Sequence, residues 1–427
     1  MKVLIVGGGG REHAIALKIK ENPEVTALYA APGNGGIAQI ATCLPFKATD
    51  VDGIVRWAAE NKVDFVIVAP DDPLCLGMVD ALAAQGIPAF GPRKNAAIIE
   101  GSKVFSKNLM KKYGIPTAAY ETFDDYDAAV KYLQTADMPI VVKADGLALG
   151  KGVLICPDRE SAVEAVASMM KEAKFGASGA RVVIEEFLTG PEVSVLAFTD
   201  GKTVKPMLSS MDHKRALDHD EGLNTGGMGT IAPNPCYTPE LAQRCMDEIF
   251  LPTIAAMNAE GRTFTGCLYF GLMMTPKGPK VIEYNCRFGD PETQVVLPLL
   301  KSDLLTIMRA TVDGTLADTP VEFASGAACC VVLASGGYPV SYKSGYLISG
   351  LDEAGKTATV FHAGTKLVDG QIVTAGGRVL GVTATADTLE AAIDKAYQAA
   401  DKITFTDMHM RRDIGQRALA SRKESHS

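Results

Sequence analysis

The chain has 427 residues, of which 47% are hydrophobic and 22% charged, a balance typical of a globular protein with about three domains. Its 42 basic and 50 acidic residues give a net charge of −8, which disfavours nucleic acid and anionic membranes as partners. Nine cysteines without a Cys-x-x-Cys pair disfavour zinc and redox sites and are typical of a reducing, cytoplasmic location.

The first hundred residues alternate short apolar runs with amphipathic segments. Val3–Val6 is too short for a signal peptide or a membrane span, and it predicts a buried strand before the glycine loop Gly7–Gly10. We predict further strands at 27–30, 65–69 and 88–90, helices at 12–20, 51–61 and 74–85, and a turn at 70–73. This alternation predicts a doubly wound parallel sheet over residues 1–100, with ligands at the carboxyl ends of its strands.

The loop Gly7–Gly10 does not match the dinucleotide-binding fingerprint. The third glycine of that motif would fall at Glu12, and no acidic residue follows the second strand, so a dehydrogenase is disfavoured. A glycine loop at the start of a helix still suits a single phosphate, because the first N–H groups of a helix have no partner within it. The loop Asn34–Gly36 should lie beside it at the same sheet edge. Two tight turns without a ligand are the alternative.

The middle of the chain, residues 101–325, predicts an α+β domain with antiparallel strands. We expect strands at 140–144, 153–156, 181–186, 193–199, 267–274 and 280–285, and helices at 102–113 and 159–174. Lys143–Gly152 joins two of these strands and is not a Walker loop, because its glycines are too closely spaced and Lys151 is not followed by serine or threonine. Such a hairpin can fold over a triphosphate, with Lys103 as an additional cation. An ordinary hairpin with solvated lysines is the alternative.

Two segments of this domain offer oxygen ligands. Glu283 and Asn285 alternate along one predicted strand and therefore point to one face, where their hard oxygens suit magnesium bound to nucleotide phosphates. Arg287 follows and offers a cation where phosphate charge would develop. Upstream, Glu185–Leu188 leads from a strand into an open segment that can frame an adenine, with Glu192 near the ribose. Solvated polar pairs are the alternative for both segments.

A last charged cluster, Asp212–Arg215, precedes the glycine-rich segment Asn224–Gly229. Together they suit a small zwitterion or an oxyanion, and a mobile polar loop is the alternative. The pattern then changes to short strands with Asp-Gly and Gly-Gly turns, followed by a helix that opens with Asp387 and Glu390 at capping-box spacing. Residues 326–422 are therefore predicted to form a small β-rich α+β domain.

Taken together and in order, these motifs resemble the ATP-grasp superfamily and, within it, the phosphoribosylamine–glycine ligase family (glycinamide ribonucleotide synthetases). The segments that carry the resemblance are Gly7–Ala14, Ala31–Gly36, Gly101–Lys103, Lys143–Gly152, Asp212–Arg215, Asn224–Gly229 and Glu283–Gln294. The resemblance extends from Met1 to about Arg422, and it implies a central ATP-grasp fold with a small lid subdomain at about 122–188.

The resemblance also implies an activity, which is the ATP-dependent ligation of glycine to 5-phosphoribosylamine through glycyl phosphate. ATP is the implied co-substrate and Mg²⁺ or Mn²⁺ the implied cofactor, and we expect a monomer, with a dimer as the alternative. The implied ATP contacts are Lys103, Lys143, Gly146, Gly150, Lys151, Gly152, Glu185, Glu186, Phe187, Leu188 and Glu192, and the implied metal ligands are Glu283 and Asn285. The implied substrate contacts are Gly9, Gly10, Glu12, Asn34, Gly35, Asp71, Asp212, His213, Lys214, Asn224 and Arg287. The implied catalytic residues are Arg287, Asp290, Asp212 and Lys143.

The sequence departs from the family pattern at four places, one of which is the unusual continuation Thr230–Pro233. Pro70-Asp71-Asp72-Pro73 replaces the usual Pro-Glu-Ala-Pro, and Leu223 replaces a proline before Asn224. The strand before Glu283 contains no acidic residue, so we expect water or a distant residue to complete the metal site. A ligase that uses formate or bicarbonate and a non-catalytic nucleotide sensor are the alternative functions. Every nucleotide-binding interpretation requires residues 143–152 and 283–287 to face each other.

Overall fold

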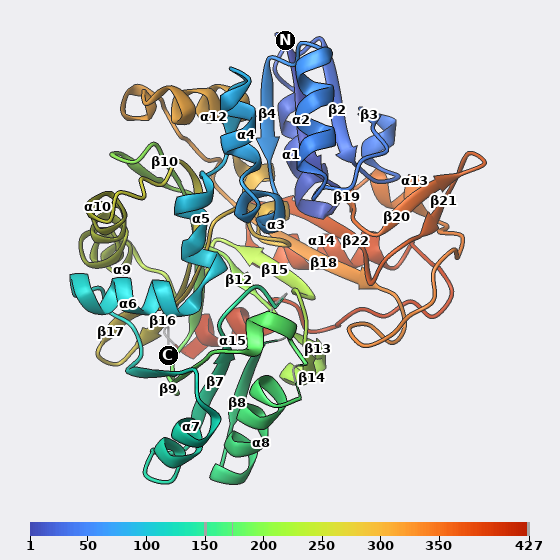
Figure 1. Ribbon diagram of the computed structural model, residues 1–427. Coiled ribbons are helices and arrows are strands. Elements are labelled where there is room, and N and C mark those ends of the chain that lie inside the picture. The colour runs from blue at the N-terminus through green and yellow to red at the C-terminus, as the bar shows by residue number, and fades with distance from the viewer. Residues whose placement is uncertain (149–151, 173, 425–427) are drawn as a thin grey trace.

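The computed structural model describes residues 1–148, 152–172 and 174–424. A central body carries a small subdomain below it and a C-terminal domain at its side (Figure 1). In the described part of the chain, no helix has the length and apolar character needed to cross a membrane.

The first domain is built on a five-stranded parallel sheet with the order β3-β2-β1-β4-β5, which confirms the predicted doubly wound sheet. Its elements are β1 (Lys2–Gly7), α1 (Gly10–Lys20), β2 (Ala27–Pro32), β3 (Thr42–Cys43), α2 (Val51–Glu60), β4 (Phe65–Val68), α3 (Asp71–Cys75), α4 (Met78–Ala84), β5 (Ala89–Phe90) and α5 (Lys94–Gly101). Val3–Val6 is completely buried, because helices and neighbouring strands cover both faces of β1.

The predicted turn at 70–73 and the single helix at 74–85 are wrong. Helix α3 begins at Asp71, directly after Pro70 in an extended conformation, and Pro73 lies in the first turn, where a missing N–H does no harm. Gly77 then separates α3 from α4, and its φ of 88° belongs to the left-handed region that favours glycine. Asp71 therefore lies at a helix start rather than in a turn.

The central domain contains an antiparallel sheet with the order β11-β10-β16-β17. Its elements are α6 (Lys103–Tyr113), β10 (Glu192–Thr199), β11 (Val204–Pro206), α9 (Pro239–Cys245), α10 (Leu251–Ala259), β16 (Gly266–Thr275), β17 (Gly278–Asn285), α11 (Thr293–Val296) and α12 (Leu304–Asp313). Side chains of this sheet and of the parallel sheet share two apolar cores, one containing Leu4 and Phe270, the other Ile5 and Leu196. The first two domains therefore form one packed body.

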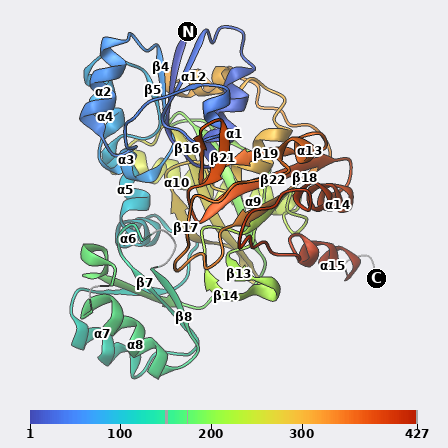
Figure 2. The ribbon, with the colours of Figure 1, turned by 90° about the vertical axis from the view of Figure 1, so that its right-hand side faces the viewer.

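The lid subdomain is a separate antiparallel sheet with the order β6-β9-β7-β8. Its elements are β6 (Tyr120–Phe123), α7 (Tyr126–Leu133), β7 (Ile140–Ala144), β8 (Val153–Cys156), α8 (Arg159–Met170) and β9 (Val182–Glu186). It has its own apolar core, which includes Leu133, Val142 and Val166. Figures 1 and 2 show it below the central body, connected to it near α6.

The C-terminal sheet has the order β12-β15-β18-β22-β19. Its elements and their neighbours are β12 (Met211–Asp212), β13 (Arg215–Leu217), β14 (Glu221–Asn224), β15 (Gly229–Ala232), β18 (Ala327–Ala334), α13 (Leu351–Gly355), β19 (Thr359–His362), β20 (Thr365–Val368), β21 (Gln371–Thr374), β22 (Arg378–Ala386), α14 (Leu389–Ala400) and α15 (Gln416–Glu424). Two of its strands, β12 and β15, come from the predicted middle domain, since β15 pairs with β18. Helix α14 is capped by Thr388, whose side chain accepts from the Ala391 N–H, and not by Asp387 as predicted.

Candidate active site

The lid and the strand β17 meet at the predicted nucleotide site. Lys143, 4% exposed at the end of β7, donates from Nζ to the Ile282 carbonyl of β17 at 3.3 Å. Lys103 Nζ donates to the Gly146 carbonyl at 2.8 Å. The expected approach of the two segments is therefore confirmed at Lys143, whereas Gly150 and Lys151 lie outside the described residues.

The predicted adenine segment begins with a buried carboxylate. Glu185 lies between the ammonium groups of Lys107, at 2.6 Å, and Lys143. Glu186 is exposed at the end of β9, and its Oε2 accepts from the Ala119 N–H at 3.2 Å. The half-buried Phe187 and Leu188 follow in a stretch without helix or strand, as predicted.

Glu283 and Asn285 lie on one face of β17, as their spacing predicts. They pair with Gly271 and Tyr269 of β16, so both point the same way from the strand. Gly271 leaves room for Glu283, because a Cβ at that position would lie 3.0 Å from Glu283 Cγ. The carboxylate and amide oxygens fit Mg²⁺ or Mn²⁺. Among the described residues, no group of three or more His, Cys, Asp or Glu side chains could hold a metal ion.

Arg287 is fixed by residues on both sides. Its Nη2 donates to Glu100 Oε1 at 2.8 Å and to Asn285 Oδ1 at 3.3 Å. Glu100 also accepts from the Cys286 N–H at 2.7 Å. Burial raises the pKa of Glu100, and the charge of Arg287 offsets only part of this effect. Within the described part of the chain, Arg287 Nε is buried without a partner, which leaves a donor for a ligand.

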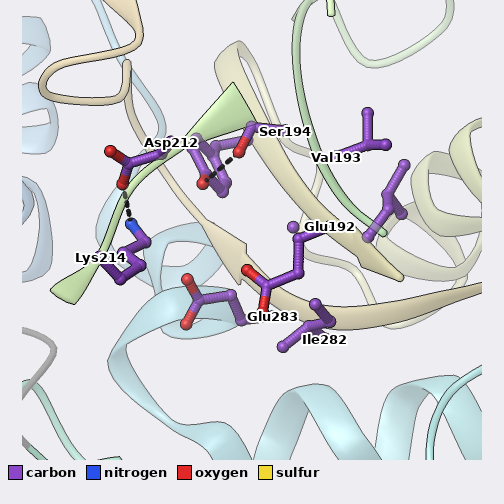
Figure 3. Close-up of a pocket in the computed structure, with 10 residues that line it drawn as sticks. Glu192, Val193, Ser194, Asp212, Lys214, Ile282 and Glu283 are labelled. Carbon is purple, nitrogen blue, oxygen red and sulfur yellow. Dashed lines mark hydrogen bonds and ion pairs between the residues drawn. The ribbon is translucent and has the colours of Figure 1, made fainter. Parts of the chain in front are cut away.

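A pocket beside Glu283 brings together Asp212 and Lys214, two of the predicted substrate contacts, whereas Asn224 and Arg287 do not line it (Figure 3). It is lined by Glu192, Val193, Ser194, Asp212, Lys214, Tyr269, Gly271, Leu272, Ile282 and Glu283. Lys214 Nζ lies 2.7 Å from Asp212 Oδ2. Burial opposes the charge of Lys214, but the nearby carboxylates, Asp212 first, raise its pKa well above the ordinary value. Three carboxylates and one ammonium group in one pocket suit a zwitterion.

His213 does not line this pocket. Its Nδ1 donates to the Gly229 carbonyl at 3.0 Å, because its Nε2 accepts from the Gly415 N–H at 3.1 Å. Burial lowers its pKa to about 4. The two ring nitrogens thus join Gly229 and Gly415 through hydrogen bonds. Asn224 lies in the hairpin β13–β14, where it pairs with Arg215. Next to it, Leu223 is 57% exposed.

The two glycine loops of the first domain lie side by side, as predicted. Asn34 Nδ2 donates to the Gly8 carbonyl at 3.0 Å and to the His362 carbonyl at 2.8 Å, and its Oδ1 accepts from Gly36 and Ile37. The Gly35 N–H donates to the Thr365 carbonyl at 3.2 Å. The loop Asn34–Gly36 is therefore held between the first and the C-terminal domain.

Carboxylates occupy the start of α1. Glu12 Oε2 accepts from the Gly9 N–H at 2.7 Å, so the side chain at N3 binds the backbone of the N-cap residue. Asp290 lies close by, where Oδ2 accepts weakly from the Arg11 N–H at 3.4 Å and Oδ1 accepts from Gln294 at 2.7 Å. The contact with Arg11 places Asp290 at the start of α1, beside Gly9 and Gly10, which are the predicted phosphoribosylamine contacts.

Three residues near the site were missed by sequence reasoning. Lys107 follows Lys103 by four residues on α6, so helical spacing could have placed both on one face. Glu100 directly precedes the motif Gly101–Lys103, but nothing local indicates its partner. Arg378 of β22 donates to the Asp290 carbonyl at 2.8 Å and has no signal in the sequence.

Comparison with known proteins agrees with this architecture along the whole chain. Models of the phosphoribosylglycinamide synthetase N domain, ATP-grasp (A) domain and C domain match residues 1–100, 101–293 and 328–417. The chain is 48% identical to a phosphoribosylamine–glycine ligase of Halalkalibacterium halodurans, over 100% of this chain and 99% of that protein. It is 49% identical to that of Rhodopirellula baltica, over 98% of each.

A solved structure leads to the same assignment. The crystal structure of phosphoribosylamine–glycine ligase from Thermotoga maritima has a TM-score of 0.86 and 35% identity, covering 97% of this chain and 100% of that one. The predicted ATP-grasp architecture is thereby confirmed. The matched domains and the identity along the full length show that the chain belongs to the phosphoribosylglycinamide synthetase family, the phosphoribosylamine–glycine ligases.

Proposed function

We propose that the chain joins glycine to 5-phosphoribosylamine, with conversion of ATP to ADP and phosphate. The observation that carries this proposal is the contact of Lys143 with Ile282, which brings the lid to Glu283 at the edge of the pocket that also contains Asp212. A phosphate-binding cation, a metal ligand and a polar pocket for a small substrate are thus adjacent.

The chemistry requires activation of the glycine carboxylate, because an amine cannot displace oxide. Transfer of the terminal phosphoryl group of ATP to a carboxylate oxygen gives glycyl phosphate and ADP. The amine of phosphoribosylamine then attacks the carbonyl carbon, the carbon–oxygen bond to phosphate breaks, and the nitrogen loses a proton. The protein contributes mainly by positioning the reactants and neutralising charge.

In this proposal, Lys103 and Lys143 bind phosphate oxygens of ATP. Glu283 and Asn285 would hold Mg²⁺ or Mn²⁺, which would neutralise phosphate charge. Arg287 directs its unpaired Nε–H toward the oxygens of the acyl phosphate. Hydrogen-bond donors fixed in a buried site stabilise developing negative charge without having to reorganise.

Glycine would bind in the pocket of Figure 3. Asp212 is suited to its ammonium group, and Lys214 to its carboxylate, because each pairs opposite charges. Phosphoribosylamine would lie at the loop Gly7–Gly10, near Asp290. Asn34 would act there by shaping the loop, since its amide already bonds to Gly8 and His362.

We also propose a monomer located in the cytoplasm. All nine cysteines are free, which supports a reducing compartment. Light scattering of the purified protein tests the first of these proposals.

The function is tested by phosphate release from ATP with glycine and freshly generated phosphoribosylamine. We expect turnover that requires both substrates and a divalent cation. Formate and bicarbonate, each replacing glycine, are the matched alternatives. Turnover with either of them and none with glycine would overturn the substrate assignment, and ATP binding without any turnover would favour a nucleotide sensor.

A further inference from the structure

A buried cluster of three charged side chains connects the lid to the central body. Lys107 on α6, Lys143 on β7 and Glu185 on β9 are 3%, 4% and 4% exposed. Lys107 Nζ lies 2.6 Å from Glu185 Oε2, and Lys143 forms an ion pair with Glu185 Oε1. Two ammonium groups therefore share one carboxylate away from water.

Both lysines are also attached to β17, immediately before Glu283. Lys107 Nζ donates to Thr117 Oγ1 at 2.7 Å, and that hydroxyl donates to the Val281 carbonyl at 2.7 Å. Lys143 Nζ donates to the next carbonyl, that of Ile282, at 3.3 Å. The cluster thus fixes the lysine of the lid relative to the metal strand.

The charge balance of the cluster is unequal. With both lysines protonated, the three groups carry a net charge of +1. A buried charge without a counter-charge is unfavourable, so the cluster favours the binding of an anion. A triphosphate beside Lys143 supplies that anion. Removal of Lys107 would leave Lys143 and Glu185 as a neutral, closed pair with no excess charge for a ligand.

We propose that Lys107 is a positioning residue of the nucleotide site, which holds Glu185 and so keeps the charge of Lys143 available to ATP phosphates. The inference rests on the proposed role of Lys143 in ATP binding. Lys107 acts through Glu185 and does not touch the nucleotide. It differs in this respect from Lys103, whose Nζ reaches the lid loop at Gly146.

The test is a double-mutant cycle in which ATP binding is measured by calorimetry in Mg²⁺, without glycine or phosphoribosylamine. Lys107→Met is expected to weaken ATP binding about tenfold, which corresponds to about 1.4 kcal/mol. The same change is made in a Glu185→Gln background, where Lys107 has no carboxylate to hold, so Lys107→Met should there change ATP affinity by less than about threefold relative to Glu185→Gln alone. Lys107→Arg, which keeps the charge, should bind ATP more tightly than Lys107→Met.

Lys111→Met is the matched control. Lys111 lies on the same helix and at almost the same distance from the Tyr120 ring, 5.7 Å compared with 5.6 Å for Lys107, but it is exposed. ATP binding should be unchanged in this variant. If Lys107→Met does not fold, Thr117→Val keeps the charge of Lys107, removes the hydroxyl that joins Lys107 Nζ to the Val281 carbonyl, and should weaken ATP binding in the same direction.

Wild-type affinity in folded Lys107→Met, or in Thr117→Val where Lys107→Met does not fold, would overturn the inference. So would a Lys107→Met change that weakens ATP binding equally in the wild-type and Glu185→Gln backgrounds, because the effect would then not pass through Glu185. The proposed function fails separately, if the wild-type protein binds ATP but releases no phosphate with glycine and phosphoribosylamine.

Discussion

Arg287 Nη2 lies 2.8 Å from Glu100 Oε1, although the two residues are 187 positions apart in the chain. Glu100 lies in the last turn of α5, at the boundary between the first two domains, and its other oxygen accepts from the Cys286 N–H. The pair therefore sets the position of Arg287 beside Asn285. It also positions Arg287 Nε, the donor that we assign to the acyl phosphate.

Glu100→Gln should lower kcat about 10- to 100-fold while ATP affinity stays within about threefold, because a buried arginine that loses its counter-charge no longer keeps its position. Steady-state kinetics and ATP calorimetry separate these two effects. Glu24→Gln, which removes the partner of Arg309 in an exposed ion pair, should leave both unchanged. An unaltered kcat in Glu100→Gln would exclude this role for the pair.

Glu283→Gln should lose most activity at ordinary magnesium concentrations while the fold survives, since an amide is a weaker ligand than a carboxylate. Part of the activity should return at higher magnesium. Turnover and metal binding by calorimetry, each measured against magnesium concentration, test this expectation. Glu240→Gln, at an exposed helix start, is the control. Unchanged turnover and metal binding in Glu283→Gln would remove this residue from the metal site.

Arg378→Met should weaken the use of glycine and phosphoribosylamine without weakening ATP binding. The guanidinium donates to the carbonyls of Asp290 and Gly227, at 2.8 and 3.3 Å, and so ties the C-terminal domain to the substrate side of the site. We expect kcat/KM for both substrates to fall by roughly tenfold or more, as for the loss of a charged hydrogen bond. Lys366→Met, exposed on β20, is the matched control. A loss confined to ATP binding would contradict this assignment.

His213 should make the protein less stable as the pH falls. Burial lowers its folded-state pKa to about 4 from 6.5, so below pH 6.5 the unfolded chain binds a proton that the folded protein does not. The contribution of His213 is fully present above pH 6.5 and is lost as the pH approaches 4, with a limit of roughly 3 kcal/mol.

Urea unfolding at pH 7, 6 and 5 measures this dependence. His213→Gln should be less stable than the wild-type protein at pH 7, because it loses the hydrogen bonds to Gly229 and Gly415. Its free energy of unfolding should nevertheless fall less steeply with pH, and the difference between the two proteins isolates this histidine from other titrating groups. Parallel pH profiles would show that His213 does not contribute.

Local patterns in the sequence determined much of the fold and part of the site. The apolar run Val3–Val6 predicted a strand buried on both faces, and the period of two predicted that Glu283 and Asn285 share one face of β17. The alternation of strands and helices placed both glycine loops at one sheet edge, where Asn34 contacts Gly8. These features depend on residues close in sequence, whose geometry the backbone fixes. The roles assigned to the individual site residues stay predictions.

The tertiary structure alone decided which distant groups meet. Glu100 pairs with Arg287, Arg378 reaches Asp290, and β15 joins the C-terminal sheet through β18. His213 does not line the pocket, because its two ring nitrogens are hydrogen-bonded to Gly229 and Gly415. Such contacts depend on the path of the whole chain, and burial favours those that give an enclosed charge or polar atom a partner.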